Sequence, residues 1–220
     1  MVLAPHPDDE ALGCAGTLLQ IKKRGGAVSI IFLTDGEMLH GNSSREIAVK
    51  RKEEARRSAG LLGCKEALFP GFPDGEIHRH RERVYEKLSE FIGDIKPDIV
   101  LSPSCIDYHS DHIATSHVAV GLLSAFRSFA LVFYEVYSTL RFNYLVDISD
   151  VVGKKEIIIS TYRTSLYEKP GLFVKAALGL NSHRSIFVQN EGFYEAFYCV
   201  EKNYDFRKIY DYLSYRDLNT

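Results

Sequence analysis

The sequence has few cysteines, no tryptophan and no strong excess of either charge. Its four cysteines are widely spaced and form no Cys-x-x-Cys pair, so a disulfide scaffold is not indicated. Lysine and arginine total 27 against 29 aspartates and glutamates, a formal net charge of −2 that argues against nucleic acid or an anionic membrane as main partner. The 13 tyrosines and 13 phenylalanines suit sugar stacking and core packing equally well.

Long apolar runs are missing as well. No stretch reaches the ~18 consecutive apolar residues that a helix needs to cross a bilayer. The N-terminus has no basic region followed by an apolar segment, so it does not resemble a secretory signal, and we expect a cytoplasmic protein. No repeat or Pro/Gly/Ser-rich linker interrupts the 220 residues, of which 45% are hydrophobic. These features predict one domain over residues 1–220 with a sizeable core.

Strand and helix patterns alternate through the first two thirds of the chain. Strands are expected at 1–4, 27–34, 66–70, 99–101, 130–137, 144–148 and 193–200. Helices are expected at 10–24, from a cap at Asn42 or Ser43 to about residue 60, before Lys96-Pro97, at 111–126 and at 170–180. Residues 150–162 have a mixed pattern, and the segment from Asn203 is tyrosine-rich with weak periodicity. The alternation predicts βαβ units, and therefore an α/β fold with a mostly parallel sheet.

The segment Ala4-Pro5-His6-Pro7-Asp8-Asp9-Glu10 places one imidazole and three carboxylates within five positions, just before a helical pattern. Burying such a cluster without a counter-ion is strongly destabilising. Histidine and aspartate are good zinc ligands, and a neighbouring carboxylate can serve as a base, so a divalent metal is one interpretation. The alternative is an acidic turn that caps the helix.

A second cluster, Tyr108-His109-Ser110-Asp111-His112, supplies two more imidazoles and a carboxylate. If a helix begins at Asp111, His112 lies in its first turn and His109 projects from the preceding loop. One imidazole can then bind a metal while the other faces a substrate, and Asp111 can orient an imidazole through a hydrogen bond. The alternative is a helix N-cap at Asp111 beside incidental histidines.

Both clusters follow predicted strands, as do residues 34–37 and 72–75. In open α/β sheets, ligands bind at the carboxyl ends of the strands, so we expect these four segments to line one site. Other candidates are interpreted as packing or surface residues rather than ligands: Cys14, Cys105, His78, His80 and His117.

The two clusters together resemble the motifs of the LmbE-like (PIG-L) zinc-dependent de-N-acetylases. The family's motifs are usually Ala-His-Pro-Asp-Asp-Glu and His-Pro-Asp-His; here Pro5 precedes His6, and Ser110 replaces the second motif's proline. Further similarities are Arg51 with Glu54, residues 72–75 and residues 195–197, whereas residues 162–165 lack the glutamine of the family's Tyr-x-Ser-Gln. The resemblance covers nearly the whole chain and implies a Rossmann-like three-layer sandwich.

The resemblance also implies a metal centre. His6, Asp9 and His112 would bind the metal and leave one coordination position open for water or a substrate oxygen. Asp8 would be the general base that takes the proton of the water, whose pKa the metal lowers from ~15.7 toward ~7.

Further roles follow from the same resemblance. His109 would stabilise the oxyanion or protonate the leaving amine, and Asp111 would hold an imidazole in place. Arg51 and Asp74 would bind hydroxyls of a sugar-like substrate. For Arg51, the alternative is a surface ion pair with Glu54. Three more acidic residues stay open: Glu10 as a fourth ligand or a helix-start carboxylate, and Asp35 and Glu37 at the mouth.

The resulting hypothesis is a metal-dependent hydrolase that removes an N-acetyl group from an N-acetylglucosamine-type sugar or glycoconjugate. Zinc is the default ion, and Fe²⁺, Co²⁺ or Mn²⁺ would accept the same ligands. One alternative is hydrolysis of a phosphoester, which would favour two metals about 3.5–4 Å apart. Another is a Rossmann-like binding module with a structural metal, although no Gly-x-Gly-x-x-Gly indicates a dinucleotide. The aglycone and a homo-oligomeric state stay open.

Overall fold

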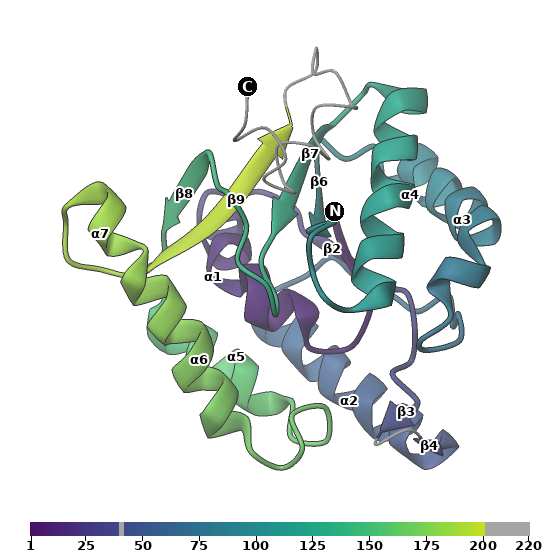
Figure 1. Cartoon of the computed structure of the whole chain (residues 1–220), viewed down its shortest axis with the longest axis horizontal. Coiled ribbons are helices and arrows are strands. Elements are labelled where there is room, and N and C mark those ends of the chain that lie inside the picture. The colour runs from purple at the N-terminus through teal and green to yellow at the C-terminus, as the bar shows by residue number, and fades with distance from the viewer. Residues whose placement is uncertain (40–41, 201–220) are drawn as a thin grey trace, which may run out of the picture.

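The computed structural model describes residues 1–39 and 42–200, and the tyrosine-rich segment from Asn203 lies outside them. A seven-stranded sheet has the order β5-β2-β1-β6-β7-β9-β8 (Figure 1). Five strands are parallel: β1 (Val2–Ala4), β2 (Ser29–Phe32), β5 (Glu66–Leu68), β6 (Ile99–Pro103) and β7 (Ala130–Tyr134). β9 (Tyr194–Val200) pairs antiparallel with β7 and with the edge strand β8 (Tyr144–Asp147). The predicted α/β fold with a mostly parallel sheet is confirmed.

Helices cover both faces of the sheet (Figure 1). One face carries α1 (Asp9–Lys23), α2 (Arg45–Leu62), α5 (Val152–Thr161) and α6 (Pro170–His183), and the other carries α3 (Arg81–Ile95) and α4 (Ser110–Phe126). Side chains alternate along the central strands: Leu3 packs with the α3 and α4 side, whereas Val2 and Ala4 pack with the α1 side. The result is the expected Rossmann-like three-layer sandwich. The shorter elements are the hairpin β3 (Met38–Leu39) and β4 (Asn42–Ser43), the 3₁₀ turn η1 (Ile77–Arg79) and α7 (Ser185–Val188).

Local capping moves two predicted helix starts. Asn42 and Ser43 form β4, and the cap of α2 is Ser44, whose hydroxyl accepts the Ile47 N–H at 3.4 Å. α4 begins at Ser110 rather than Asp111, because the Nδ1 atom of His109 accepts the Asp111 N–H at 3.2 Å.

Two other segments differ from the sequence prediction. The strand expected at 130–137 ends at Tyr134, because the Glu135 carboxylate accepts the Leu140 N–H at 2.9 Å and closes a loop. Residues 135–137 therefore leave the sheet at its carboxyl edge. The mixed segment 150–162 contains a regular helix, α5.

A buried ion pair fixes the helix that follows the first motif. Lys155 on α5 donates to the Glu195 carboxylate on β9 at 2.7 Å, and both side chains are fully buried. Lys155 also donates to the backbone oxygen of Leu12, while Glu195 accepts the N–H groups of Gly16 and Thr17. These contacts hold α1, α5 and β9 in one arrangement.

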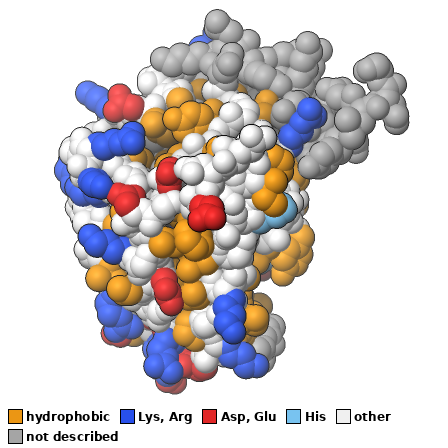
Figure 2. All heavy atoms as spheres, turned by 90° about the vertical axis from the view of Figure 1, so that its left-hand side faces the viewer, with side chains coloured by type: hydrophobic (Ala, Val, Ile, Leu, Met, Phe, Trp, Pro, Cys, Tyr) orange, Lys and Arg blue, Asp and Glu red, His pale blue; other side chains and the backbone are white. Residues whose placement is uncertain are grey.

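The face that carries α6 and α7 mixes apolar and charged side chains (Figure 2). Its exposed apolar residues include Leu172 on α6 and Ile186 and Phe187 on α7. Across residues 1–39 and 42–200, no helix combines the length and the apolar character needed to span a membrane.

Replacing Lys155 by Met is expected to lower the free energy of unfolding by about 3–5 kcal/mol, because it leaves the Glu195 carboxylate buried without its cation. Denaturant titration of both variants would measure this loss, with the exposed neighbour Lys154→Met as the matched control. Equal unfolding free energies for the two variants would contradict a stabilising role for the pair.

Candidate active site

The two predicted motifs meet at the carboxyl edge of the sheet. His6 and Asp8 lie between β1 and α1, while His109 and His112 follow β6. β1 and β6 are neighbours in the sheet, so segments about a hundred residues apart come into contact. The loop with Asp74 joins the same edge through a parallel bridge between Thr34 and Phe72. The structure therefore brings these segments together at one edge of the sheet, as expected.

Three buried side chains, those of His6, Asp9 and His112, form a compact triangle. His6 Nδ1 lies 3.3 Å from Asp9 Oδ2 and 3.4 Å from His112 Nε2. His112 Nε2 is 3.2 Å from Asp9 Oδ1. Asp9 and His112 are fully buried, and His6 is nearly so.

The triangle fits a metal ion. Bonds of about 2.0–2.1 Å in a tetrahedral zinc site place neighbouring donors roughly 3.3–3.4 Å apart. The observed separations are close to this value, with Asp9 Oδ2 facing His6 and Asp9 Oδ1 facing His112. Asp9 Oδ1 is also buried and receives no hydrogen bond. The donor set of two imidazoles and one carboxylate can therefore hold a divalent cation, and it is the set that the family resemblance implied.

Carboxylates contact the outward nitrogen of each imidazole in the triangle. His6 Nε2 lies 3.0 Å from Asp74 Oδ1 and 3.3 Å from Asp111 Oδ2. His112 Nδ1 lies 3.4 Å from Asp107 Oδ2. Such contacts favour a proton on the outward nitrogen and leave the inward nitrogen free to bind a metal.

Two groups of possible metal donors share His6, one with His109 and His112 and one with Asp74 and Asp111. The carboxylates of the latter group are already engaged, since Asp111 accepts the N–H groups of Gly75 and Ile77, and Asp74 accepts that of Met38. These bonds make it a support for His6 more than an open metal site. Asp111 thus contacts an imidazole, as the sequence suggested.

Asp8 lies beside the triangle in a strained conformation. Its φ of 135° is a conformation that non-glycine residues rarely adopt, and such strain often occurs at functional sites. Its Oδ2 is 3.6 Å from the Arg51 guanidinium, and its Oδ1 has no hydrogen-bond partner. Burial raises the pKa of Asp8 to about 8. Burial acts on Asp9 as well, but the adjacent imidazoles of His112 and His6 hold its pKa well below the usual range.

His109 lies next to the triangle, and one of its ring nitrogens already takes part in a hydrogen bond. Its ring centre is 4.6 Å from that of His6 and 5.0 Å from that of His112. Because Nδ1 accepts the Asp111 N–H, the neutral ring carries its proton on Nε2. Burial and the nearby imidazoles lower the pKa of His109. This histidine can therefore donate a hydrogen bond from Nε2.

Arg51 is buried, and its guanidinium lies near the carboxylates of Asp8 and Asp74 rather than pairing with Glu54, which was the alternative for it. It donates to Ser165 Oγ at 2.8 Å and to the backbone oxygens of Gly36 and Pro7. Glu54 instead accepts the N–H groups of residues 164 and 165. The guanidinium fits closely because a Cβ at position 36, where φ is +66°, would lie 2.6 Å from it.

The three acidic residues whose roles the sequence left undecided have partners outside the donor triangle. Glu10 lies outside the donor triangle, and its Oε1 accepts the hydroxyls of Ser58 and Tyr162, both at 2.6 Å. Asp35 pairs with Lys52, and Glu37 accepts the Asp74 N–H. Among the described residues, the candidate metal groups include none of Cys14, Cys105, His78, His80 and His117.

Sequence reasoning missed Asp107 and Tyr137. Asp107 lies in the loop before the second motif. The signal available in the sequence was a carboxylate two residues before His109. Tyr137 stacks on the His112 ring, with centres 5.6 Å apart and an interplanar angle of 15°. It was hidden because residues 135–137 were assigned to a strand.

Comparison with known proteins identifies similar sequences and structures. Residues 1–123 match the family described as GlcNAc-PI de-N-acetylase, PIG-L. The chain is 31% identical to the diacetylchitobiose deacetylase of Thermococcus kodakarensis, covering 76% of this chain and 70% of that protein. Three further curated relatives are matched over 62%, 58% and 48% of their own length.

Two solved structures share the fold over most of both chains. The conserved protein TT1542 from Thermus thermophilus has a TM-score of 0.77 and 28% identity, covering 93% of this chain and 95% of that one. The N,N'-diacetylchitobiose deacetylase from Pyrococcus horikoshii, complexed with its inhibitor MPG, has a TM-score of 0.76 and 25% identity, covering 91% and 83%.

Replacing Asp107 by Asn is expected to weaken metal binding about 10–100-fold, because the charge behind the His112 imidazole is lost while the donors remain. Competition with a chromophoric chelator would measure the affinity. Asp94→Asn on the exposed surface of α3 is the control. An unchanged affinity in Asp107→Asn would show that this carboxylate does not support the imidazole as a ligand.

Proposed function

The chain belongs to the PIG-L family of GlcNAc-PI de-N-acetylases, and on this basis we propose that it is a metal-dependent hydrolase removing the N-acetyl group from an N-acetylglucosamine-type sugar or glycoconjugate. The observation that carries the proposal is the triangle of His6, Asp9 and His112 with Asp8 beside it. The relative from T. kodakarensis is a deacetylase of an N-acetylated sugar, which supports the same substrate class.

His6 Nδ1, Asp9 and His112 Nε2 are the proposed metal ligands. A bound divalent ion would polarise the amide carbonyl and lower the pKa of water and of neighbouring carboxyl groups. Zinc is the proposed ion, although Fe²⁺, Co²⁺ and Mn²⁺ bind similar donors.

Asp8 is the proposed general base. Its carboxylate is buried beside the triangle, and its Oδ1 has no hydrogen-bond partner, so this atom is available to accept a proton from water. The Arg51 guanidinium near Oδ2 favours the ionised form that a base requires.

His109 is the proposed partner of the reacting amide. With Nδ1 held by the Asp111 N–H, its Nε2 proton can stabilise the oxyanion or pass to the leaving amine. Asp111 is the proposed positioning residue for His6, which its carboxylate contacts.

Arg51 and Asp74 are the proposed contacts to substrate hydroxyls. A guanidinium has five N–H donors, and Arg51 uses three of them for Ser165, Gly36 and Pro7, which leaves capacity for a ligand. Tyr108 and Tyr137 are exposed next to the histidines, with ring centres 5.6 Å apart, and offer an apolar wall for a sugar ring.

Replacing Asp8 by Asn is expected to reduce kcat for acetate release from N-acetylglucosamine conjugates about 10²–10⁴-fold, because the proton acceptor is lost. Bound metal should stay stoichiometric, since Asp8 is not a proposed ligand. Asp35→Asn, which removes a carboxylate paired with Lys52, is the control and should retain near wild-type kcat. An Asp8→Asn enzyme with wild-type kcat would exclude Asp8 as the base.

Replacing His109 by Asn separates a catalytic role from a structural metal site. Asparagine can still cap α4, so the helix start should be preserved. A role toward the substrate predicts a lower kcat with unchanged metal affinity. A large loss of metal affinity would instead identify His109 as a fourth ligand in a closed site, which is the structural alternative.

A further inference from the structure

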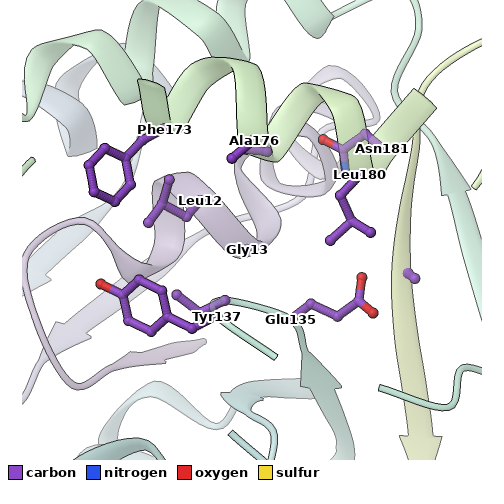
Figure 3. Close-up of a pocket in the computed structure, with 11 residues that line it drawn as sticks. Leu12, Gly13, Glu135, Tyr137, Phe173, Ala176, Leu180 and Asn181 are labelled. Carbon is purple, nitrogen blue, oxygen red and sulfur yellow. The ribbon is translucent and has the colours of Figure 1, made fainter. Parts of the chain in front are cut away.

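A cavity of about 310 Å³ lies between α1, the segment after β7 and α6 (Figure 3). At roughly 30 Å³ for each water-sized group, it has room for about ten non-hydrogen atoms. Its walls are mainly apolar and include Leu12, Val136, Phe173 and Leu180. Phe173 and Tyr137 lie at one end, and Asn181 and Glu135 lie at the other (Figure 3).

The cavity adjoins the candidate active site through two elements. On α1, Leu12 and Gly13 in the cavity wall are each four residues after Asp8 and Asp9, so they continue the same helix face by one turn. Tyr137 lines the cavity and also stacks on His112. The Tyr137 backbone N–H donates to the Asp107 carboxylate at 3.2 Å, and the same carboxylate contacts His112.

The polar groups at the end of the cavity formed by Asn181 and Glu135 suit a largely uncharged ligand. The Glu135 carboxylate is paired with Arg184 and accepts the Leu140 N–H, so its charge is already balanced. Asn181 is only 5% exposed and donates to the Tyr194 backbone oxygen, yet its Oδ1 has no hydrogen-bond partner. A buried acceptor without a donor is costly, and a hydroxyl or water at the end of a ligand would satisfy it.

The order of the strands places the cavity on the opposite side of the donor triangle from Arg51 and Asp74, the proposed contacts to substrate hydroxyls. Arg51 and Asp74 lie by the loops after β2 and β5, the triangle lies at β1 and β6, and the cavity lies at β7 and β9. The amine and acyl substituents of an amide point away from each other across the C–N bond. A substrate whose sugar contacts Arg51 therefore directs its acyl group toward the cavity.

We propose that this cavity receives the acyl chain of the substrate, so that the enzyme hydrolyses N-acyl amino sugars with chains of several carbons as well as N-acetyl sugars. The inference rests on the proposed function. The reaction is ordinary amide hydrolysis: water adds its oxygen to the acyl carbon, the C–N bond breaks, and the amine takes a proton. The products are the free amino sugar and a carboxylate, and water is the only co-reactant.

The test compares kcat/KM for glucosamine carrying N-acetyl, N-butyryl and N-hexanoyl groups, measured as amine release by the metal-loaded enzyme. Wild type should hydrolyse the hexanoyl substrate within about tenfold of the acetyl substrate. Ala176 lines the cavity from α6, and Ala176→Phe should fill it, lowering hexanoyl hydrolysis by at least about tenfold while sparing acetyl hydrolysis. Leu172→Phe adds similar bulk at an exposed position of the same helix and is the control.

A second readout uses wild type alone. Hexanoate should inhibit acetyl hydrolysis at lower concentration than acetate does, because its chain occupies the cavity. Acetyl hydrolysis without hexanoyl hydrolysis would overturn the inference and leave the proposed function intact. An equal loss on all three substrates in Ala176→Phe would also overturn it and favour an aglycone in the cavity. Failure to hydrolyse any N-acyl sugar would overturn the proposed function itself.

Discussion

The buried imidazole of His6 is the group on which the arrangement of the site depends. Its Nδ1 faces Asp9 and His112, and its Nε2 faces Asp74 and Asp111. The carboxylates on either side would repel one another in a dry environment if this ring did not lie between them. The ring therefore links the first motif, the second motif and the loop after β5, and a cation at the inner triangle would complete the charge balance.

The polypeptide around this cluster is held by buried side-chain contacts with the backbone. Arg51 donates to the oxygens of Gly36 and Pro7, and Ser165 donates to Pro7 at 2.8 Å. Glu54 fixes the backbone of residues 164 and 165 through their N–H groups. These bonds connect α2 and the segment after α5 to the loop that carries Asp8, and they maintain its unfavourable φ against relaxation.

α1 contributes to both the candidate metal site and the adjoining cavity. Its first turn carries Asp9, whereas the next turn presents Leu12 and Gly13 to the cavity. Gly13 is needed there because a Cβ would lie 2.3 Å from the Tyr134 ring and 2.6 Å from the Glu135 backbone oxygen. The close approach brings the segment after β7 against α1, and this contact sets where Tyr137 meets His112. The position of one helix thus affects both the candidate metal site and the adjoining cavity.

Much of the fold could be predicted because its signals are local. The apolar run at 27–34 indicates a buried strand, and the spacing of apolar residues in 10–24 indicates a helix. Both patterns are visible among residues that are close together in the sequence. The two short motifs of unusual composition are local as well, whereas the choice of His6, Asp9 and His112 within them came from the family resemblance. Boundaries were less accurate, because the caps at Ser44 and His109 and the loop after Tyr134 depend on single hydrogen bonds.

By itself, the sequence determined the α/β class, the two motifs and their shared edge of the sheet. Only the tertiary structure decided which nitrogen of each histidine faces the triangle, because that depends on carboxylates from distant segments, Asp74 for His6 and Asp107 for His112. It also decided that Arg51 is buried and that Tyr137 both stacks on His112 and lines a cavity. These relationships join residues far apart in the chain, and their geometry follows from the order in which the strands pair.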